Sequence, residues 1–95
     1  MEQSLVLTFD VGTQSARCLL VNESGDFEDK EQQKYKVPYL SKQPGWAEQT
    51  PDFYFNIIAE MSKKVIERNA DKLDRITAVC LTCIRDTVLC LDKDK

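Results

Sequence analysis

The residues best suited to chemistry lie near the start of the chain, in the string TFDVGTQSARCLL. An apolar, strand-like segment delivers Asp10, and the chain then turns through Gly12, Thr13, Gln14 and Ser15. A glycine lets backbone amides approach phosphate oxygens closely, neighbouring hydroxyl groups add donors, and an aspartate can hold a hydrated magnesium ion. These residue types, in this order, are suited to binding a polyphosphate.

Arg17 supplies a cation beside this turn, and on an ideal strand it shares a face with Ser15 and Thr13. Spacing alone leaves two interpretations open, a phosphate-binding turn and a β-hairpin with an ordinary polar turn. For Arg17 the alternative is a solvated cation at a strand edge. The sequence has no G-x-G-x-x-G and no G-K-[ST] string after a strand, so the Rossmann and Walker patterns are both missing. A phosphate loop here would lie between two strands.

A second polar pair, Arg85 and Asp86, follows the strongly apolar segment at residues 75–83. Ligands of α/β sheets usually bind at the carboxyl ends of strands. A carboxylate accepts hydrogen bonds from hydroxyl groups and an arginine donates them, so the pair could hold a polyol from two sides. The alternative is a surface turn with an ion pair.

Trp46 lies in a Pro-Gly-Trp string that is typical of a loop. Its ring could form an apolar wall against the C–H face of a polyol, or it could anchor the loop by packing on the domain. Glu48 and Gln49 could hold the same loop through hydrogen bonds.

Hydrophobic patterning predicts the elements that position these residues. Thr50 and Pro51 resemble an N-cap and the first residue of a helix. Apolar residues then recur at three- and four-residue steps, so one helix face should pack on a sheet. We expect strands at 4–9 and 16–22, followed by a solvated third strand that ends near Pro38. A helix should run from Asp52 to about Asn69. A strand at 75–83 is continuously apolar and is therefore expected to be central in the sheet, and a short strand should follow at 86–92. The order β-β-β-α-β-β predicts one α/β unit with a mixed sheet, truncated at its end.

Composition fits one small soluble globular domain, because the hydrophobic share is 42% and the charged share 31%. The net charge of -3, without a basic cluster, argues against nucleic acid as a partner. No apolar run approaches the roughly 20 residues of a membrane span, so we expect no membrane contact and a cytoplasmic location. Histidine is absent, which excludes a His-based catalytic dyad within this chain.

The four cysteines lie in apolar segments that are typical of strands, so we expect buried thiols. Cys80 and Cys83 form a C-x-x-C string, but on a strand they point to opposite faces. This disfavours both a shared metal and a disulfide.

Three strings, in order, resemble the FGGY family of carbohydrate kinases, within the actin, Hsp70 and hexokinase superfamily. The string FDVGTQSARCLLVNESGD is similar to the family's first phosphate motif, and QPGWAEQTPDFYF is similar to its P-G-W-x-E-Q-x-P segment. The third string, ITAVCLTCIRDTVLCLDKD, resembles a later segment with an arginine and an acid. The middle string distinguishes the FGGY family from actin-like and chaperone ATPases, because those proteins share only the first string. The resemblance implies a ribonuclease H-like fold, with residues 1–95 as the incomplete N-terminal part of the first kinase domain.

The resemblance also implies an activity of the glycerol kinase or xylulokinase type, in which ATP and Mg²⁺ phosphorylate a hydroxyl group of a sugar or polyol. It assigns ATP and phosphate binding to Asp10, Gly12, Thr13, Gln14, Ser15 and Arg17, magnesium binding through water to Asp10, and substrate binding to Arg85, Asp86 and Trp46. The partners that it implies are the sugar or polyol, ATP and the remainder of the kinase chain. It leaves open whether the protein forms a homodimer.

The chain departs from the family pattern at Cys83 and Ile84, where a small residue and a glutamine usually precede the arginine. Glycerol specificity therefore does not follow, and the Arg85 and Asp86 pair does not favour a xylulokinase. The family's general base, an aspartate on a later strand, has no match, so we expect the chain alone to be inactive. The alternatives are a non-catalytic nucleotide-binding module of the actin and Hsp70 type, and a small structural domain with a fortuitous turn.

Overall fold

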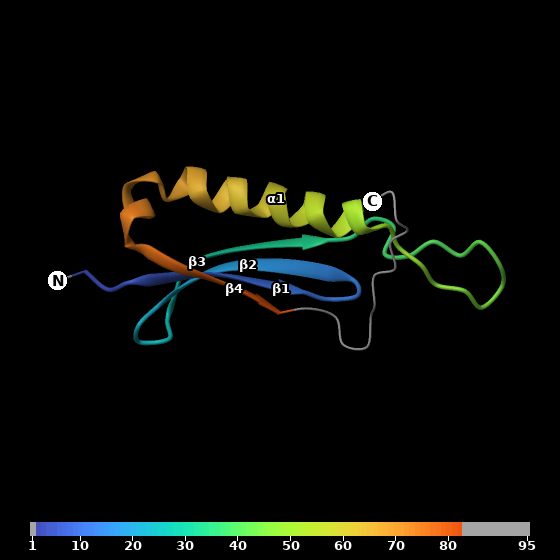
Figure 1. The fold of residues 1–95 in the computed structure, drawn as a ribbon, viewed down its shortest axis with the longest axis horizontal. Helices are drawn as coiled ribbons and strands as arrows, with labels where there is room; N and C mark the ends of the chain where they lie inside the picture. Colours follow the sequence, from blue (N-terminus) through green and yellow to red (C-terminus); the bar gives the residue numbers. More distant parts are fainter. Residues whose placement is uncertain (1, 83–95) are drawn as a thin grey trace, which may run out of the picture.

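The computed structural model describes residues 2–82, which form a sheet covered on one face by a helix (Figure 1). The elements are β1 (Leu5–Val11), β2 (Ser15–Asn22), β3 (Phe27–Lys34), α1 (Pro51–Arg68), the 3₁₀ helix η1 (Ala70–Arg75) and β4 (Ile76–Thr82). The strand order is β3-β2-β1-β4, with β1 antiparallel to β2 and parallel to β4. The predicted mixed sheet is confirmed, and the strand predicted at 86–92 lies outside the described residues.

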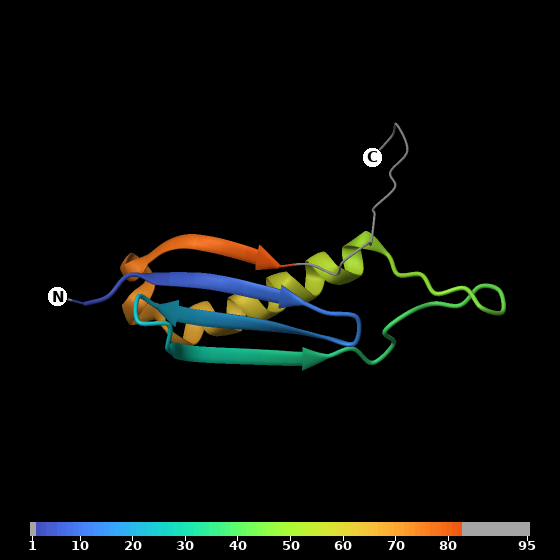
Figure 2. The ribbon, with the colours of Figure 1, turned by 90° about the horizontal axis from the view of Figure 1, so that it is seen from below.

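The inner face of the sheet is built by alternation along its strands. In β1, the side chains of Leu5, Leu7, Phe9 and Val11 are buried, and the residues between them are only partly buried. Successive side chains of a strand point to opposite faces, so Asp10 lies on the face away from α1. The view in Figure 2 is from that open face, with α1 behind the sheet.

The helix α1 supplies the other half of the core. Its first turn is capped as predicted, because Thr50 Oγ1 accepts a hydrogen bond of 3.3 Å from the Phe53 N–H and Pro51 follows the cap. Neither helix of the described residues combines the length and the apolar character that a bilayer crossing requires. Helix and sheet share one buried cluster: Leu5, Leu7, Phe9, Ala16, Cys18, Leu20, Tyr35, Ile57, Met61 and Val65.

The third strand ends at Lys34, so the prediction that it continues to about Pro38 is wrong. That prediction depended on alternation at Tyr35, Val37 and Tyr39. Only Tyr35 is buried, whereas Val37 and Tyr39 are 53% and 57% exposed. The chain leaves the sheet after Lys34, and the apolar residues beyond Tyr35 belong to a loop.

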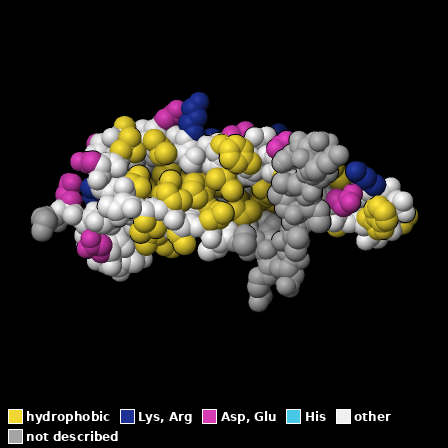
Figure 3. All heavy atoms as spheres, in the orientation of Figure 1, with side chains coloured by type: hydrophobic (Ala, Val, Ile, Leu, Met, Phe, Trp, Pro, Cys, Tyr) yellow, Lys and Arg dark blue, Asp and Glu magenta, His cyan; other side chains and the backbone are white. Residues whose placement is uncertain are grey.

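In the described part of the chain, the strand β4 lies at the edge of the sheet beside β1, whereas the sequence predicted a central position. Its register places Val79 beside Leu7 and Leu81 beside Phe9, so these side chains face the side of the sheet that α1 covers. However, α1 packs on β2 and β3, and Val79 and Leu81 remain 66% and 60% exposed. Figure 3, in the orientation of Figure 1 with α1 above the sheet, shows hydrophobic side chains gathered along this edge of the molecule. An apolar composition indicates a surface that tends to be covered, but it does not specify which element covers it.

The two cysteines within the described residues differ in environment, and both are free thiols. Cys18 is fully buried, as predicted, and this burial raises the pKa of its thiol to about 11. Cys80 is exposed on β4, so the prediction of a buried thiol is wrong at that position. Its register partner is Thr8, so Cys80 lies on the face of the sheet away from α1, which no described element covers. Cys83 and Cys90 lie outside the described residues.

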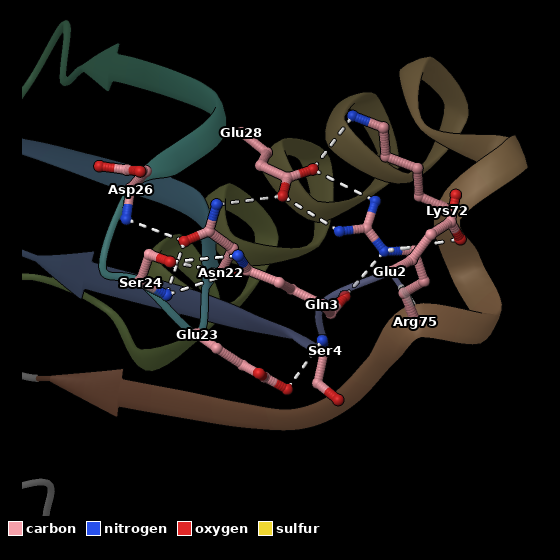
Figure 4. Close-up of polar contacts among 10 residues, drawn as sticks. All are labelled: Glu2, Gln3, Ser4, Asn22, Glu23, Ser24, Asp26, Glu28, Lys72 and Arg75. Atoms are coloured by element: carbon pink, nitrogen blue, oxygen red, sulfur yellow. Dashed lines mark hydrogen bonds and ion pairs between the residues drawn. The ribbon is translucent and has the colours of Figure 1, made fainter.

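A network of polar side chains connects η1 to the strands at the end of the sheet where β1 begins (Figure 4). The Arg75 guanidinium donates to both carboxylate oxygens of Glu28, at 3.3 and 3.1 Å, and to the carbonyl oxygen of Gln3 at 2.8 Å. Lys72 and Asn22 donate to the same carboxylate at 3.4 and 3.2 Å. The network joins η1, β2, β3 and the segment before β1, and its Arg75 side chain is only 15% exposed.

This network predicts a pH-dependent contribution to stability. Its hydrogen bonds, with that from Arg75 first, hold the pKa of Glu28 below its ordinary value of 4.5. A carboxyl group whose pKa is lowered on folding stabilises the native state above its unfolded pKa, and the contribution is lost as pH falls through the lower folded value. We therefore expect Glu28→Gln to lower the Tm of the whole protein at neutral pH, and the deficit to shrink as pH falls below 4.5.

Thermal unfolding of the wild type and Glu28→Gln across this pH range measures the effect. Glu67→Gln, at an exposed position on α1, is the matched control and should leave the Tm unchanged at every pH. A Glu28→Gln deficit of the same size in acid as at neutral pH would contradict the assignment of the effect to the ionised carboxylate.

Candidate functional site

The turn between β1 and β2 carries the residues predicted to bind phosphate. The Gly12 N–H donates to the Ser15 carbonyl oxygen at 2.9 Å, which leaves Thr13 and Gln14 exposed at the tip. A Cβ atom added to Gly12 would lie 3.0 Å from that carbonyl oxygen, closer than ordinary van der Waals contact. Glycine is therefore favoured by this close approach, and the structure gathers all four turn residues at one end of the sheet.

Asp10 lies at the end of β1 between side chains from both neighbouring strands. Arg17, its cross-strand neighbour on β2, forms an ion pair with Asp10 through Nη2 and Oδ2, and the two side chains are 49% and 40% exposed. From β4, Thr82 Oγ1 lies 3.1 Å from Asp10 Oδ1. The hydrogen bonds from Arg17 and then Thr82 hold the pKa of Asp10 below its ordinary value of 3.8. Asp10 is therefore an anionic, accessible carboxylate at neutral pH.

These donors and charges fit a magnesium-bound polyphosphate. An ionised carboxylate with access to solvent is a typical partner for Mg²⁺ or its bound water. The tip residues Thr13 and Gln14 offer a hydroxyl group and an amide, and backbone N–H groups add donors for phosphate oxygens. Arg17 brings a permanent positive charge to the same face of the sheet.

Tyr35 belongs to this site, although it is absent from the residues predicted from the sequence. Its hydroxyl group donates to the Gly12 carbonyl oxygen at 2.9 Å, and its backbone N–H donates to the Gln14 carbonyl oxygen at 2.9 Å. The side chain packs edge-on against Phe53 and Tyr54, with ring centroids 5.0 and 6.2 Å away. Burial, more than the neighbouring Tyr54 and Asp10, raises the pKa of Tyr35 to about 12. The hydroxyl group therefore keeps its proton and remains a donor.

The loop between β3 and α1 extends past the end of the sheet that carries the β1–β2 turn (Figures 1 and 2). Within it, Leu40 and Glu48 pair through two backbone hydrogen bonds, and the Gln49 side chain donates to the Val37 carbonyl oxygen at 3.1 Å. Glu48 and Gln49 thus hold the loop, as predicted. Trp46 is 50% exposed, so half of its surface is accessible to a ligand.

The second predicted pair, Arg85 and Asp86, lies outside the described residues. The described part of the chain ends at Thr82, which is the register partner of Asp10 on β1. Arg85 and Asp86 therefore follow, three and four positions later in the sequence, a residue that contacts Asp10.

Sequence comparison finds a family match over almost the whole chain. The N-terminal domain of the FGGY family of carbohydrate kinases matches residues 5–95. Glycerol kinase 2 of Thermotoga maritima is 33% identical over 89 residues, which are 94% of this chain and 18% of the relative. The glycerol kinase of Pseudothermotoga lettingae is 31% identical over 94 residues, or 99% of this chain and 18% of that enzyme. The chain thus spans about a fifth of the length of these relatives.

Two solved structures share the fold. Gluconate kinase from Lactobacillus acidophilus superposes with a TM-score of 0.65 and 23% identity, over 86% of this chain and 16% of that chain. Plasmodium falciparum glycerol kinase with ADP superposes with a TM-score of 0.63 and 21% identity, over 86% of this chain and 15% of that chain. The α/β fold class predicted from the sequence is confirmed.

Proposed function

Because the chain belongs to the FGGY family of carbohydrate kinases, we propose that the whole protein transfers the γ-phosphoryl group of ATP to a hydroxyl group of a sugar or polyol. The chain supplies the first phosphate-binding hairpin and part of the sugar site, and it is inactive alone because it holds no match for the family's general base. The observation that carries the proposal is the glycine turn beside the ionised, accessible Asp10 carboxylate.

Phosphoryl transfer depends mainly on positioning and charge neutralisation, and the hairpin offers groups for both. In the proposed complex, Asp10 holds the magnesium ion of the nucleotide through water, and this ion neutralises charge on the phosphates. Thr13, Gln14 and Ser15 donate hydrogen bonds to the β- and γ-phosphates. Arg17, which pairs with Asp10 here, provides a further cation for the phosphate oxygens.

For the acceptor, we propose that Arg85 and Asp86 hold substrate hydroxyl groups and that Trp46 covers the C–H face of the same molecule. An arginine donates to hydroxyl oxygens and a carboxylate accepts from hydroxyl hydrogens. The half-exposed ring of Trp46 has free apolar surface for this contact. Relatives named glycerol kinase and a structural neighbour named gluconate kinase support a small polyhydroxylated acceptor.

Arg85→Ala in the whole protein should weaken substrate binding selectively. A hydrogen bond from a charged donor contributes about 1.5–3 kcal/mol, so KM for the sugar or polyol should rise roughly 10- to 100-fold while KM for ATP changes little. Steady-state kinetics with each substrate varied in turn measures this. Lys63→Ala, which removes an exposed cation from α1, is the control. If the Arg85→Ala enzyme keeps the wild-type KM for the sugar or polyol, Arg85 does not bind the substrate.

A panel of sugars and polyols, incubated with the whole protein, ATP and Mg²⁺, tests the activity itself. The proposal predicts ADP formation that depends on one acceptor or a few chemically related ones. Binding of MgATP without acceptor-dependent ADP formation across the panel would reject the kinase activity. That result would favour a nucleotide-binding module without phosphotransfer.

A further inference from the structure

We propose that Tyr35 is a positioning residue for nucleotide binding, because its hydroxyl group orients the Gly12–Thr13 peptide unit so that the Thr13 N–H faces a phosphate oxygen. This inference rests on the proposed role of the turn as a phosphate site. It adds a residue from the end of β3 to a site otherwise built from β1, β2 and β4.

Tyr35 fixes the turn at two points. Its hydroxyl group holds the Gly12 carbonyl oxygen at 2.9 Å, and its backbone N–H holds the Gln14 carbonyl oxygen at 2.9 Å. The two acceptors flank Thr13, the first residue of the exposed tip. One residue thus restrains the peptide units on both sides of the tip, although it lies 23 positions away from Gly12 in the sequence.

The contact between the Tyr35 hydroxyl group and the Gly12 carbonyl oxygen fixes the direction of the Thr13 N–H, because both belong to one peptide unit. The described residues contain no cis peptide bond, and in a planar trans peptide the C=O and the N–H point in opposite directions. The Gly12 carbonyl points to the Tyr35 hydroxyl group, which belongs to a side chain buried between the sheet and α1. The Thr13 N–H of the same peptide unit therefore points away from the core, toward the face of the sheet that carries Asp10 and Arg17.

The tyrosine is itself held in place, which makes it a suitable support. It is 8% exposed, and its ring meets Phe53 and Tyr54 of α1 at interplanar angles of 78° and 73°. Edge-on aromatic pairs of this kind favour a defined ring orientation. A turn that is already fixed when the ligand arrives loses less conformational freedom on binding, so the hydroxyl group contributes to nucleotide affinity through preorganisation.

Tyr35→Phe in the whole protein tests the proposal, because it keeps the ring and removes only the hydroxyl group. We expect the Kd for MgADP, measured by calorimetry, to rise roughly 3- to 10-fold, as for the loss of one neutral hydrogen bond. KM for the sugar or polyol should stay unchanged, and hydrogen exchange at the Thr13 amide should become faster. Tyr54→Phe, which removes a hydroxyl group from the neighbouring ring, is the matched control and should alter neither measurement.

The outcomes separate this inference from the proposed function. A wild-type MgADP affinity in Tyr35→Phe overturns the inference, and faster Thr13 exchange without an affinity change also overturns it, since the hydroxyl group would then be only structural. A wild type that binds MgADP but phosphorylates no acceptor contradicts the proposed function and leaves the Tyr35 measurement decisive. A wild type that does not bind MgADP rejects both.

Discussion

Asp10→Asn in the whole protein is expected to reduce kcat by about 100-fold or more, the loss typical when a group that stabilises transition-state charge is removed. The amide has nearly the shape of the carboxylate and can still accept the hydrogen bond from Thr82. However, it has no charge to attract a hydrated magnesium ion or to balance Arg17. Steady-state kinetics at saturating ATP and acceptor measures the effect.

The fold should survive this change, because Asp10 and Arg17 form a partly exposed pair, and such pairs contribute little to stability. Asp26→Asn, in the exposed turn at the opposite end of the sheet, is the matched control and should keep wild-type kcat. A kcat of Asp10→Asn within about threefold of the control would remove Asp10 from the phosphate site.

Met61→Ala should have the largest effect on stability. Met61 is fully buried in the cluster between α1 and the sheet, so truncation removes apolar contacts and leaves a cavity. Core changes from methionine to alanine typically lower the free energy of unfolding by about 2–5 kcal/mol. Urea unfolding of the whole protein measures this change in stability.

Lys63→Ala, at an exposed position on the same helix, controls for changes in helix propensity and should stay within about 0.5 kcal/mol of the wild type. If Met61→Ala is no more destabilising than this control, the helix does not pack on the sheet through the face that carries Met61.

Local sequence signals were sufficient to predict an element where its bounds depend only on residues within the same segment. The cap at Thr50 and the three- and four-residue apolar steps predicted α1 to within a residue or two of its observed bounds. The end of β3 and the exposure of β4 in the described residues were missed for a common reason. Both depend on which neighbours cover a residue, and alternation or apolar composition in a single segment does not contain that information.

The same distinction between local and distant residues applies to the candidate site. The turn from Gly12 to Ser15 is contiguous, so its residue types were enough to predict a tight turn between two strands and to propose it as a phosphate loop. Thr82 reaches the site from β4 and Tyr35 from the residue directly after β3, 72 positions from Asp10 and 23 from Gly12. Identifying them requires the parallel register of β4 on β1 and the point where β3 ends. In the sequence, Tyr35 looks no different from the exposed Tyr39.

A crystal structure of the whole protein with MgADP would locate the phosphates relative to the β1–β2 turn, and it therefore decides whether this turn is the phosphate site. We expect phosphate oxygens within hydrogen-bonding distance of Thr13, Gln14 or Ser15, and the magnesium ion on the Asp10 side of the sheet. A fully occupied nucleotide bound elsewhere, with the turn free of any phosphate contact, would show that the hairpin does not bind the nucleotide.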